Sequence, residues 1–217
     1  MAYSDFTLEL TLQRFGLRLD DHTHLFQGLT AVDPGQALRA TLADTVPLAT
    51  AVHTEKARSE LIVVPILLEA WRRMGRQVSF FSGVALDIDF EEGLNEVCDF
   101  LFSRCPTQFI LGPPILAVVE AKNDSIRGGL GQCAAELVAS RLFNTRQVPP
   151  SPLSPHERVH GVVTTGSLWR FLRLQGKLLQ IDRVEYTHDQ VGEILAILMD
   201  CLKGPGSSFP TQPEGIA

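Results

Sequence analysis

Residues 115–124 constrain the fold of this chain more than any other stretch. Five apolar residues, Ile115–Val119, run directly into Glu120, Ala121 and Lys122, and a polar Asn-Asp pair ends the run. An unbroken apolar run rich in Val and Ile is typical of a strand buried on both faces. Alternation along such a strand places Glu120 and Lys122 on one face, with Ala121 opposite. Because burying unpaired charges is costly, the two charged residues form either a structural ion pair or part of a metal site.

Hydrophobic periodicity elsewhere predicts alternating helices and strands. A long, largely buried helix is expected to begin after a Thr54 cap and to end at Gly75. The other expected elements are strands over 78–90, 95–103 and 115–121, a helix over 132–143, strands over 160–166, 169–174 and 178–186, and a helix over 191–202. A turn at Gln175-Gly176-Lys177 joins the last two strands. This order predicts the α/β class, with a central mixed sheet flanked by helices.

The N-terminal region allows more than one interpretation. Residues 4–19 fit both strand alternation and helical spacing, and we favour a helix capped by Ser4 or Asp5 and ended by Gly16. The Asp and His residues of 20–24 are typical of either a metal site or a solvated turn, and the turn is favoured. A loop with one short helix over 34–44 is expected in 27–52. We expect a single domain over 1–203 with its core at about 54–185, a loop over 146–156 and a disordered tail over 204–217.

Composition narrows the classes of protein. The chain has 217 residues and a net charge of −6, which argues against a non-specific nucleic-acid coat. No apolar run approaches the length of a membrane span, and no signal-peptide layout is present, so a cytoplasmic protein without a membrane partner is expected. Its four cysteines form no Cys-x-x-Cys pair, which is evidence against a zinc knuckle or a redox motif.

Several acids fall at positions that suggest chemistry. Glu60 lies within the first long helix, and Asp99 lies inside a predicted strand, where aspartate is disfavoured and needs a partner or a task. If the strands of Asp99 and Glu120 are neighbours, two carboxylates converge beside Lys122. Two buried carboxylates cannot both stay ionised without a cation. Mg²⁺ suits such a site, because carboxylates, waters and a substrate phosphate complete its shell.

The set Asp99, Glu120-Ala121-Lys122, Glu60 upstream and Gln132 downstream resembles the PD-(D/E)XK phosphodiesterase superfamily, whose fold is restriction-endonuclease-like. The resemblance covers roughly residues 54–185, where an αβββαβ core is expected, and residues 118–143 look like uncharacterised, often cyanobacterial, members. It implies Mg²⁺ or Mn²⁺ held by Asp99 and Glu120 with Glu60, and Lys122 as the catalytic lysine. Gln132 matches the glutamine seen on the following helix in several branches.

Two functions follow from this resemblance. The first is a metal-dependent endonuclease, a hydrolase of phosphodiester bonds in DNA, with DNA preferred over RNA as partner and a homodimer implied for double-strand cutting. The alternative is a catalytically weak or inactive nuclease-fold protein with a nucleic-acid-binding or regulatory role. Basic residues for such contacts are scattered along the chain: Arg72, Arg73, Arg76, Arg127, Arg170, Arg173 and Lys177. A small-molecule enzyme is less favoured, because no phosphate loop, nucleophile elbow or dinucleotide fingerprint is present.

Overall fold

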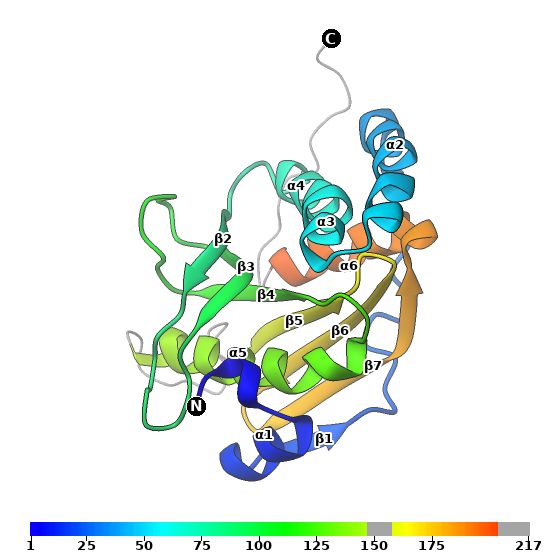
Figure 1. Ribbon diagram of the computed structural model, residues 1–217. Coiled ribbons are helices and arrows are strands. Elements are labelled where there is room, and N and C mark those ends of the chain that lie inside the picture. Colours follow the sequence, from blue (N-terminus) through cyan, green and yellow to red (C-terminus); the bar gives the residue numbers. More distant parts are fainter. Residues whose placement is uncertain (147–157, 204–217) are drawn as a thin grey trace.

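The computed structural model describes residues 1–146 and 158–203, which form one seven-stranded mixed sheet with helices on both faces (Figure 1). The strand order is β1-β7-β6-β5-β4-β3-β2. The strands are β1 (Arg18–Asp20), β2 (Ser79–Ala85), β3 (Val97–Ser103), β4 (Ile115–Ala121), β5 (Arg158–Thr164), β6 (Leu168–Gln175) and β7 (Leu178–Thr187). The α-helices are α1 (Leu8–Phe15), α2 (Gln36–Val52), α3 (Glu55–Arg58), α4 (Val64–Arg73), α5 (Ile126–Arg146) and α6 (Val191–Lys203). The predicted α/β class with a mixed sheet is confirmed.

Each face of the sheet has its own apolar layer. Helices α5 and α1 cover one face of the sheet and lie in front of the strands in Figure 1. Helix α6 lies behind the strands. Under α5 the sheet contributes buried residues such as Val118 and Leu172. On the opposite face, α4 and α6 pack over Val119 and Phe171. None of the helices within residues 1–146 and 158–203 is long and apolar enough to cross a membrane.

Strand β4 is an inner strand of the sheet, between β5 and β3, and is buried along its whole length, as the apolar run predicts. It pairs antiparallel with β3 and parallel with β5, and α5 makes the crossover that a parallel pair requires. At the first residue of β4, the side-chain amide of Asn144 on α5 accepts the N–H of Ile115 (2.7 Å) and donates to its carbonyl oxygen (2.8 Å). The same helix therefore clamps the start of the strand that it crosses.

Helix α5 begins at Ile126, six residues before the predicted start at Gln132, so the prediction was wrong there. Glycines in a helix interior are disfavoured on propensity, but packing overrides propensity here. A Cβ on Gly131 would lie 2.2 Å from the backbone oxygen of Phe6, and a Cβ on Gly129 would lie 2.6 Å from Cγ1 of Val163. Both glycines let neighbouring segments approach the helix closely, and Gln132 consequently lies in its second turn.

The predicted helix from Thr54 to Gly75 is confirmed, with one interruption. Thr54 Oγ1 accepts the N–H of Ala57 (3.1 Å), and a π-helical turn over Ser59–Val63 separates α3 from α4. Pro65 has no N–H to donate to the carbonyl of Leu61, which disturbs the helix at this point. The Leu61 oxygen is satisfied instead by the hydroxyl of Thr45 on α2 (2.6 Å).

Helix α2 is longer than predicted, because it runs to Val52 instead of ending at Asp44. The proline at position 47 lies inside it, where a proline usually ends a helix. Burial of Leu38 and Ala49 in the core explains why the helix continues. Tertiary packing again overrides local propensity.

The N-terminal helix and its predicted end at Gly16 are confirmed, but the predicted N-caps Ser4 and Asp5 are wrong. The N-cap of α1 is Thr7, whose Oγ1 accepts the N–H of Leu10 (3.2 Å), and Gly16 ends the helix with φ of 59°. Ser4 and Asp5 belong instead to a short 3₁₀ turn over Tyr3–Asp5. Strand β1 was not predicted, since three residues are too few for a periodic signal.

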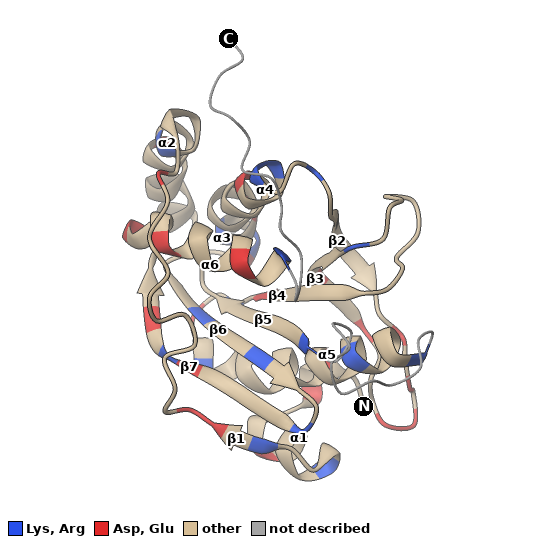
Figure 2. Ribbon diagram, turned by 180° about the vertical axis from the view of Figure 1, so that it is seen from behind, with Lys and Arg blue, Asp and Glu red and all other residues tan. Residues whose placement is uncertain are grey.

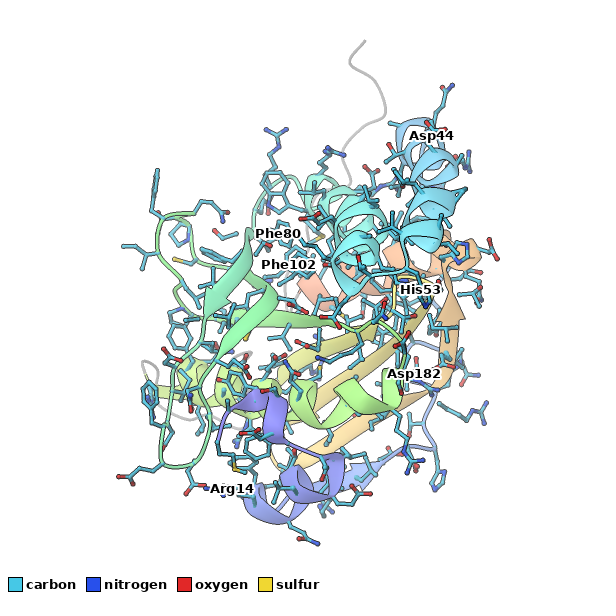
Figure 3. The ribbon with its side chains drawn as sticks, in the orientation of Figure 1. Arg14, Asp44, His53, Phe80, Phe102 and Asp182 are labelled. Atoms are coloured by element: carbon cyan, nitrogen blue, oxygen red, sulfur yellow. The ribbon has the colours of Figure 1, made fainter. Side chains whose placement is uncertain are left out.

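The strand predicted over 78–90 is too long, because β2 ends at Ala85 and residues 86–89 form only an irregular connection bonded to Leu94 and Glu96. The bounds of the remaining predicted strands agree with the structure to within two residues. Strands β6 and β7 form the expected antiparallel pair, and Gly176 takes φ of 55° in the turn between them. Phe80 of β2 stacks on Phe102 of β3, with ring centroids 4.8 Å apart, and the two rings lie side by side below α4 in Figure 3. The predicted tail and almost all of the predicted 146–156 loop lie outside the described residues.

Candidate functional site

The predicted neighbours Asp99 and Glu120 do lie on adjacent strands. The β3–β4 ladder runs to the pair Phe100–Val119, and Asp99 follows at the end of the pairing. There the Asp99 carboxylate Oδ2 accepts the N–H of Ala121 (2.8 Å). This bond accounts for an aspartate within a strand, because the side chain supplies an acceptor where the two strands cease to pair.

Glu120 and Lys122 form the ion pair that their shared face predicts. Lys122 Nζ lies 2.5 Å from Glu120 Oε1, and the Glu120 side chain is only 3% exposed. The same ammonium donates to Oε1 of Gln132 on α5 (2.9 Å). Its side chain is 25% exposed, so the lysine lies at the boundary between the buried acid and solvent.

Glu136, one turn beyond Gln132 on α5, was missed from the sequence. Its side chain is fully buried, and its Oε1 accepts a bond from Gln132 Nε2 (3.3 Å). It also lies within hydrogen-bonding reach of the Glu120 carboxyl. The available signal was its spacing of four residues from Gln132, which places both side chains on one helix face. A glutamate among Cys133, Ala134, Ala135 and Leu137 is otherwise unexpected.

The buried acids have perturbed pKa values. Burial raises the pKa of Asp99 above its usual range. Burial and the neighbouring Asp99 charge raise the pKa of Glu120 to about 7, although Lys122 opposes them. Burial and Glu120 raise the pKa of Glu136 well above its usual value. One lysine therefore does not offset the cost of holding several carboxylates in this environment.

Two carboxylate oxygens in this cluster lack hydrogen-bond partners. Within residues 1–146 and 158–203, Oε2 of Glu120 and Oε2 of Glu136 are buried without a donor. Such buried acceptors are uncommon in folded proteins and indicate strain, a missing ion or a functional role. Perturbed carboxyls beside a cavity are also more frequent at functional sites than elsewhere.

A surface hollow of about 260 Å³ opens beside Asp99. Its lining comes from α3, the π-helical turn and the start of α4 on one side and from strands β2, β3 and β4 on the other: Glu55, Lys56, Ser59, Glu60, Val64, Ser82, Gly83, Asp99, Phe100 and Ala121. A Cβ on Gly83 would meet nothing within 4 Å. Gly83 thus leaves this side of the hollow open to a ligand.

Glu60 lies on the rim of the hollow and not against the other acids. Its carboxylate pairs with Lys56 Nζ (2.6 Å), and its side chain is 57% exposed. Burial is the main cause of the raised pKa of Asp99, and the charge of Glu55, in the first turn of α3, adds to it. Burial lowers the pKa of Lys122, but the charge of Glu120 and, to a smaller extent, that of Glu55 raise it. Glu55 directly follows the Thr54 cap, where an acid also stabilises the start of a helix.

No three His, Cys, Asp or Glu side chains of residues 1–146 and 158–203 come together in an arrangement that would hold a metal ion. Asp99 and Glu120 still form a two-carboxylate pair, with one buried oxygen of Glu120 lacking a donor in this part of the chain. A pair of this kind fits Mg²⁺, which takes one or two carboxylates together with waters and substrate oxygens.

Asp20 is the last residue of β1, and residues 21–24 form a loop after it, which agrees with the favoured turn. Asp20 accepts the N–H groups of His22 (3.1 Å) and Thr23 (3.3 Å), and His24 Nε2 contacts the hydroxyl of Tyr186 (3.2 Å). These bonds make the carboxylate of Asp20 part of the loop structure. The candidate metal ligands are therefore the acids at the end of β4.

Most of the basic residues considered for nucleic-acid contacts have partners in the protein. Arg73 pairs with Glu69 (2.7 Å), and Arg170 pairs with Glu185 (3.2 Å). Arg173 donates to the amide oxygen of Gln180. Figure 2 shows basic and acidic positions interspersed over the back of the molecule. On the described surface, the basic side chains are thus interspersed with acidic ones and do not form a separate basic patch.

Comparisons of the chain with protein-family models, with curated proteins and with solved structures find no match.

Proposed function

We propose that this protein is a metal-dependent nuclease that hydrolyses phosphodiester bonds of DNA on a restriction-endonuclease-like core. The observation that carries the proposal is the meeting of Asp99, Glu120 and Lys122 where β3 and β4 cease to pair, beside an open hollow. The order of a helix, three antiparallel strands, a helix and a parallel strand supports it as well. That order agrees with the resemblance to the PD-(D/E)XK superfamily.

Asp99 and Glu120 are the residues that would hold Mg²⁺ or Mn²⁺, with Glu60 on the rim or Glu55 in the first turn of α3 acting on the ion through solvent. The fit is supported by the raised pKa values of both acids, because a divalent cation favours their ionised forms. When bound, such a cation lowers the pKa of a water and offsets charge on a phosphate. The hollow gives a phosphate access to the Asp99 carboxylate, and Ala121, the residue after Glu120, also lines it.

Lys122 has a donor left for the reaction. An ammonium has three N–H donors. In the described part of the chain, two of them are used by Glu120 Oε1 and Gln132 Oε1. The third can donate to a phosphate oxygen. Glu120 and Gln132 thereby orient the amine that neutralises charge on the phosphate. In the hydrolysis the water oxygen would bond to phosphorus and release its proton to solvent, while the phosphorus–sugar oxygen bond breaks and the sugar oxygen takes up a proton from solvent.

The test is cleavage of plasmid and linear DNA with Mg²⁺ or Mn²⁺ by the wild type and by Asp99→Asn and Lys122→Met. We expect each variant to cleave at least about 100-fold more slowly, the usual effect of losing a positioned acid–base group. The matched controls are Asp44→Asn and Lys203→Met, which change exposed residues that do not line the hollow; Asp44 lies at the far part of α2 in Figure 3. Absence of cleavage by the wild type, or equal cleavage by all five proteins, would overturn the proposal.

The alternative is a nuclease-fold protein that binds nucleic acid or regulates without cutting. It is favoured by one observation: the basic side chains of α4 and β6 are engaged with acids and amides of the protein itself. Calorimetric titration with Mg²⁺ and Mn²⁺ separates the two functions. A folded wild type that binds neither ion at millimolar concentration supports the alternative, whereas binding that Asp99→Asn abolishes supports the nuclease.

A further inference from the structure

The buried side of the site contains a hydrogen-bonded chain that the proposed reaction does not use directly. Lys122 Nζ donates to Gln132 Oε1 (2.9 Å), and Gln132 Nε2 donates to Glu136 Oε1 (3.3 Å). Glu136 is fully buried, and after burial the charge of Glu120 is the largest influence on its pKa. A buried carboxyl in the middle of a helix costs stability unless it performs a task.

Glu136 determines which way the Gln132 amide points. An ammonium can only donate hydrogen bonds, so the amide must present its oxygen to Lys122. The NH₂ end then needs an acceptor on its other side, and Glu136 Oε1 is the acceptor there. With an apolar residue at position 136, the NH₂ group would lose this acceptor, and the amide would be free to rotate away from the lysine.

We propose that Glu136 is a positioning residue for the Lys122 ammonium and acts through the Gln132 amide. The chain Glu136–Gln132–Lys122 and the Glu120 carboxylate hold the amine from two directions, which fixes the third donor toward the open side. The positioning of Lys122 is independent of whether the protein cuts DNA. Its consequence for cleavage rests on the proposed function.

The direct test measures the reactivity of Lys122 with an amine-acylating reagent, followed by peptide mass spectrometry. Lys177, which is exposed and lies in the β6–β7 turn, serves as the internal reference in each sample. In Glu136→Leu the acylation rate of Lys122 relative to Lys177 is expected to rise about 3-fold to 10-fold, the range produced by losing one hydrogen bond. In Glu136→Gln it is expected to stay within about twofold, because a glutamine there still offers an oxygen to Gln132.

Two further variants distinguish positioning from a general loosening of the core. Leu137→Ala removes a fully buried side chain from the same helix, and it should leave the relative rate of Lys122 unchanged. Gln132→Met should raise that rate as much as Glu136→Leu does, and the double variant should add nothing, because both changes break one chain. An unchanged rate in Glu136→Leu, or an equal rise in Leu137→Ala, would overturn the proposal. If Glu136→Leu does not fold, the relative acylation rate of Lys122 in Gln132→Met is compared with that in Leu137→Ala. A rise in Gln132→Met alone supports the proposal, and no rise, or an equal rise in both, overturns it.

The consequence for cleavage is measured separately. If the wild type cuts DNA, Glu136→Leu should lower kcat by about 10-fold to 100-fold, the effect of removing a supporting side chain behind a site residue, with KM little changed. Glu136→Gln should restore most of the rate. If the wild type does not cut, the proposed function fails, and the acylation rates still decide whether Glu136 positions Lys122.

Discussion

The two ends of strand β4 receive buried polar side chains from the same helix, but with opposite outcomes. At the start of the strand, the neutral amide of Asn144 makes two well-formed hydrogen bonds to the backbone of Ile115. At its far end, the carboxyls of Glu120 and Glu136 lie close together, and within the described residues each has one buried oxygen without a donor. Helix α5 thus provides a satisfied contact at one end and an unsatisfied one at the other.

The two ends of β4 differ in whether their buried polar groups have all their hydrogen-bond partners, and this distinguishes groups that stabilise the fold from groups kept for a function. A fully satisfied buried group stabilises a unique arrangement, whereas a partly satisfied group costs stability and is retained for another reason. The Asn144 amide matches its two backbone partners one to one. With its carboxyls ionised, the carboxylate end has more acceptors than donors, and a bound cation or a retained proton would correct that imbalance. The comparison therefore points to the far end of β4 as the functional end.

The largest expected effect comes from breaking the satisfied end. Asn144→Ala leaves the N–H and C=O of Ile115 buried without partners, and each such group costs about 1–3 kcal/mol. We expect the free energy of unfolding to fall by about 2–6 kcal/mol, measured by urea denaturation at pH 5 and pH 8. The loss should be equal at both pH values, because the clamp contains no titratable group. A loss below about 1 kcal/mol would show that the clamp is not a stabilising contact.

The carboxylate end should instead make stability depend on pH. In metal-free protein the pKa of Glu120 is about 7 when folded, against an ordinary value of 4.5. The folded state then binds more protons between these values, so linkage makes stability fall as pH rises through this window. The contribution present below pH 4.5 should be lost by pH 8, and its size is about 3 kcal/mol.

This pH effect is measured as a difference between variants. The unfolding free energy of the wild type minus that of Glu120→Gln should decrease by about 3 kcal/mol from pH 4 to pH 8. Asp44→Asn provides the control, because Asp44 is exposed on α2. The unfolding free energy of the wild type minus that of Asp44→Asn should change by less than about 0.5 kcal/mol between pH 4 and pH 8. A Glu120→Gln difference that increases with pH would mean that the Glu120 carboxylate is stabilised by folding, contrary to the comparison.

Sequence patterns predicted the sheet and the carboxylate end better than they predicted the helices. The apolar run before Glu120 and the alternation in β6 and β7 are local signals, and they gave the right elements. The start of α5 was missed, because Gly129 and Gly131 are disfavoured locally and favoured only by contacts with Val163 and Phe6.

Long-range contacts also explain what the sequence did not reveal about the site. Asp99, Glu120, Lys122 and Gln132 were identified by position, and the structure places them together. Glu136 was missed, since its relation to Glu120 depends on how α5 crosses β4. The choice between Glu55 and Glu60 depends on the rotation of a helix that is interrupted by a π turn, and residue spacing does not determine that rotation.

A smaller effect is expected from crowding Lys122 on the carboxylate side. Gly129→Ala would place a Cβ 2.6 Å from Cγ1 of Val163 and 3.1 Å from Cγ of Lys122. Overpacking of this kind costs about 1–3 kcal/mol, and it should also raise the acylation rate of Lys122. Gly128→Ala is the matched control, because its Cβ would meet nothing closer than 3.9 Å. It should stabilise the helix by up to about 1 kcal/mol, and a loss of stability there would contradict the explanation from packing.

The smallest expected effect concerns the two acids farther from the carboxylate end, Glu55 and Glu60, and their contributions to metal affinity. Glu55 raises the pKa of both Asp99 and Lys122, whereas Glu60 is tied to Lys56 at the rim. In calorimetric titrations with Mn²⁺, Glu55→Gln should weaken binding by about fivefold, which is the effect of one charge acting through solvent at about 1 kcal/mol. Glu60→Gln should change the affinity by less than about twofold, because an exposed ion pair contributes little. The reverse order would mean that Glu60 leaves Lys56 to take part in binding, and the rim, not the first turn of α3, would then complete the site.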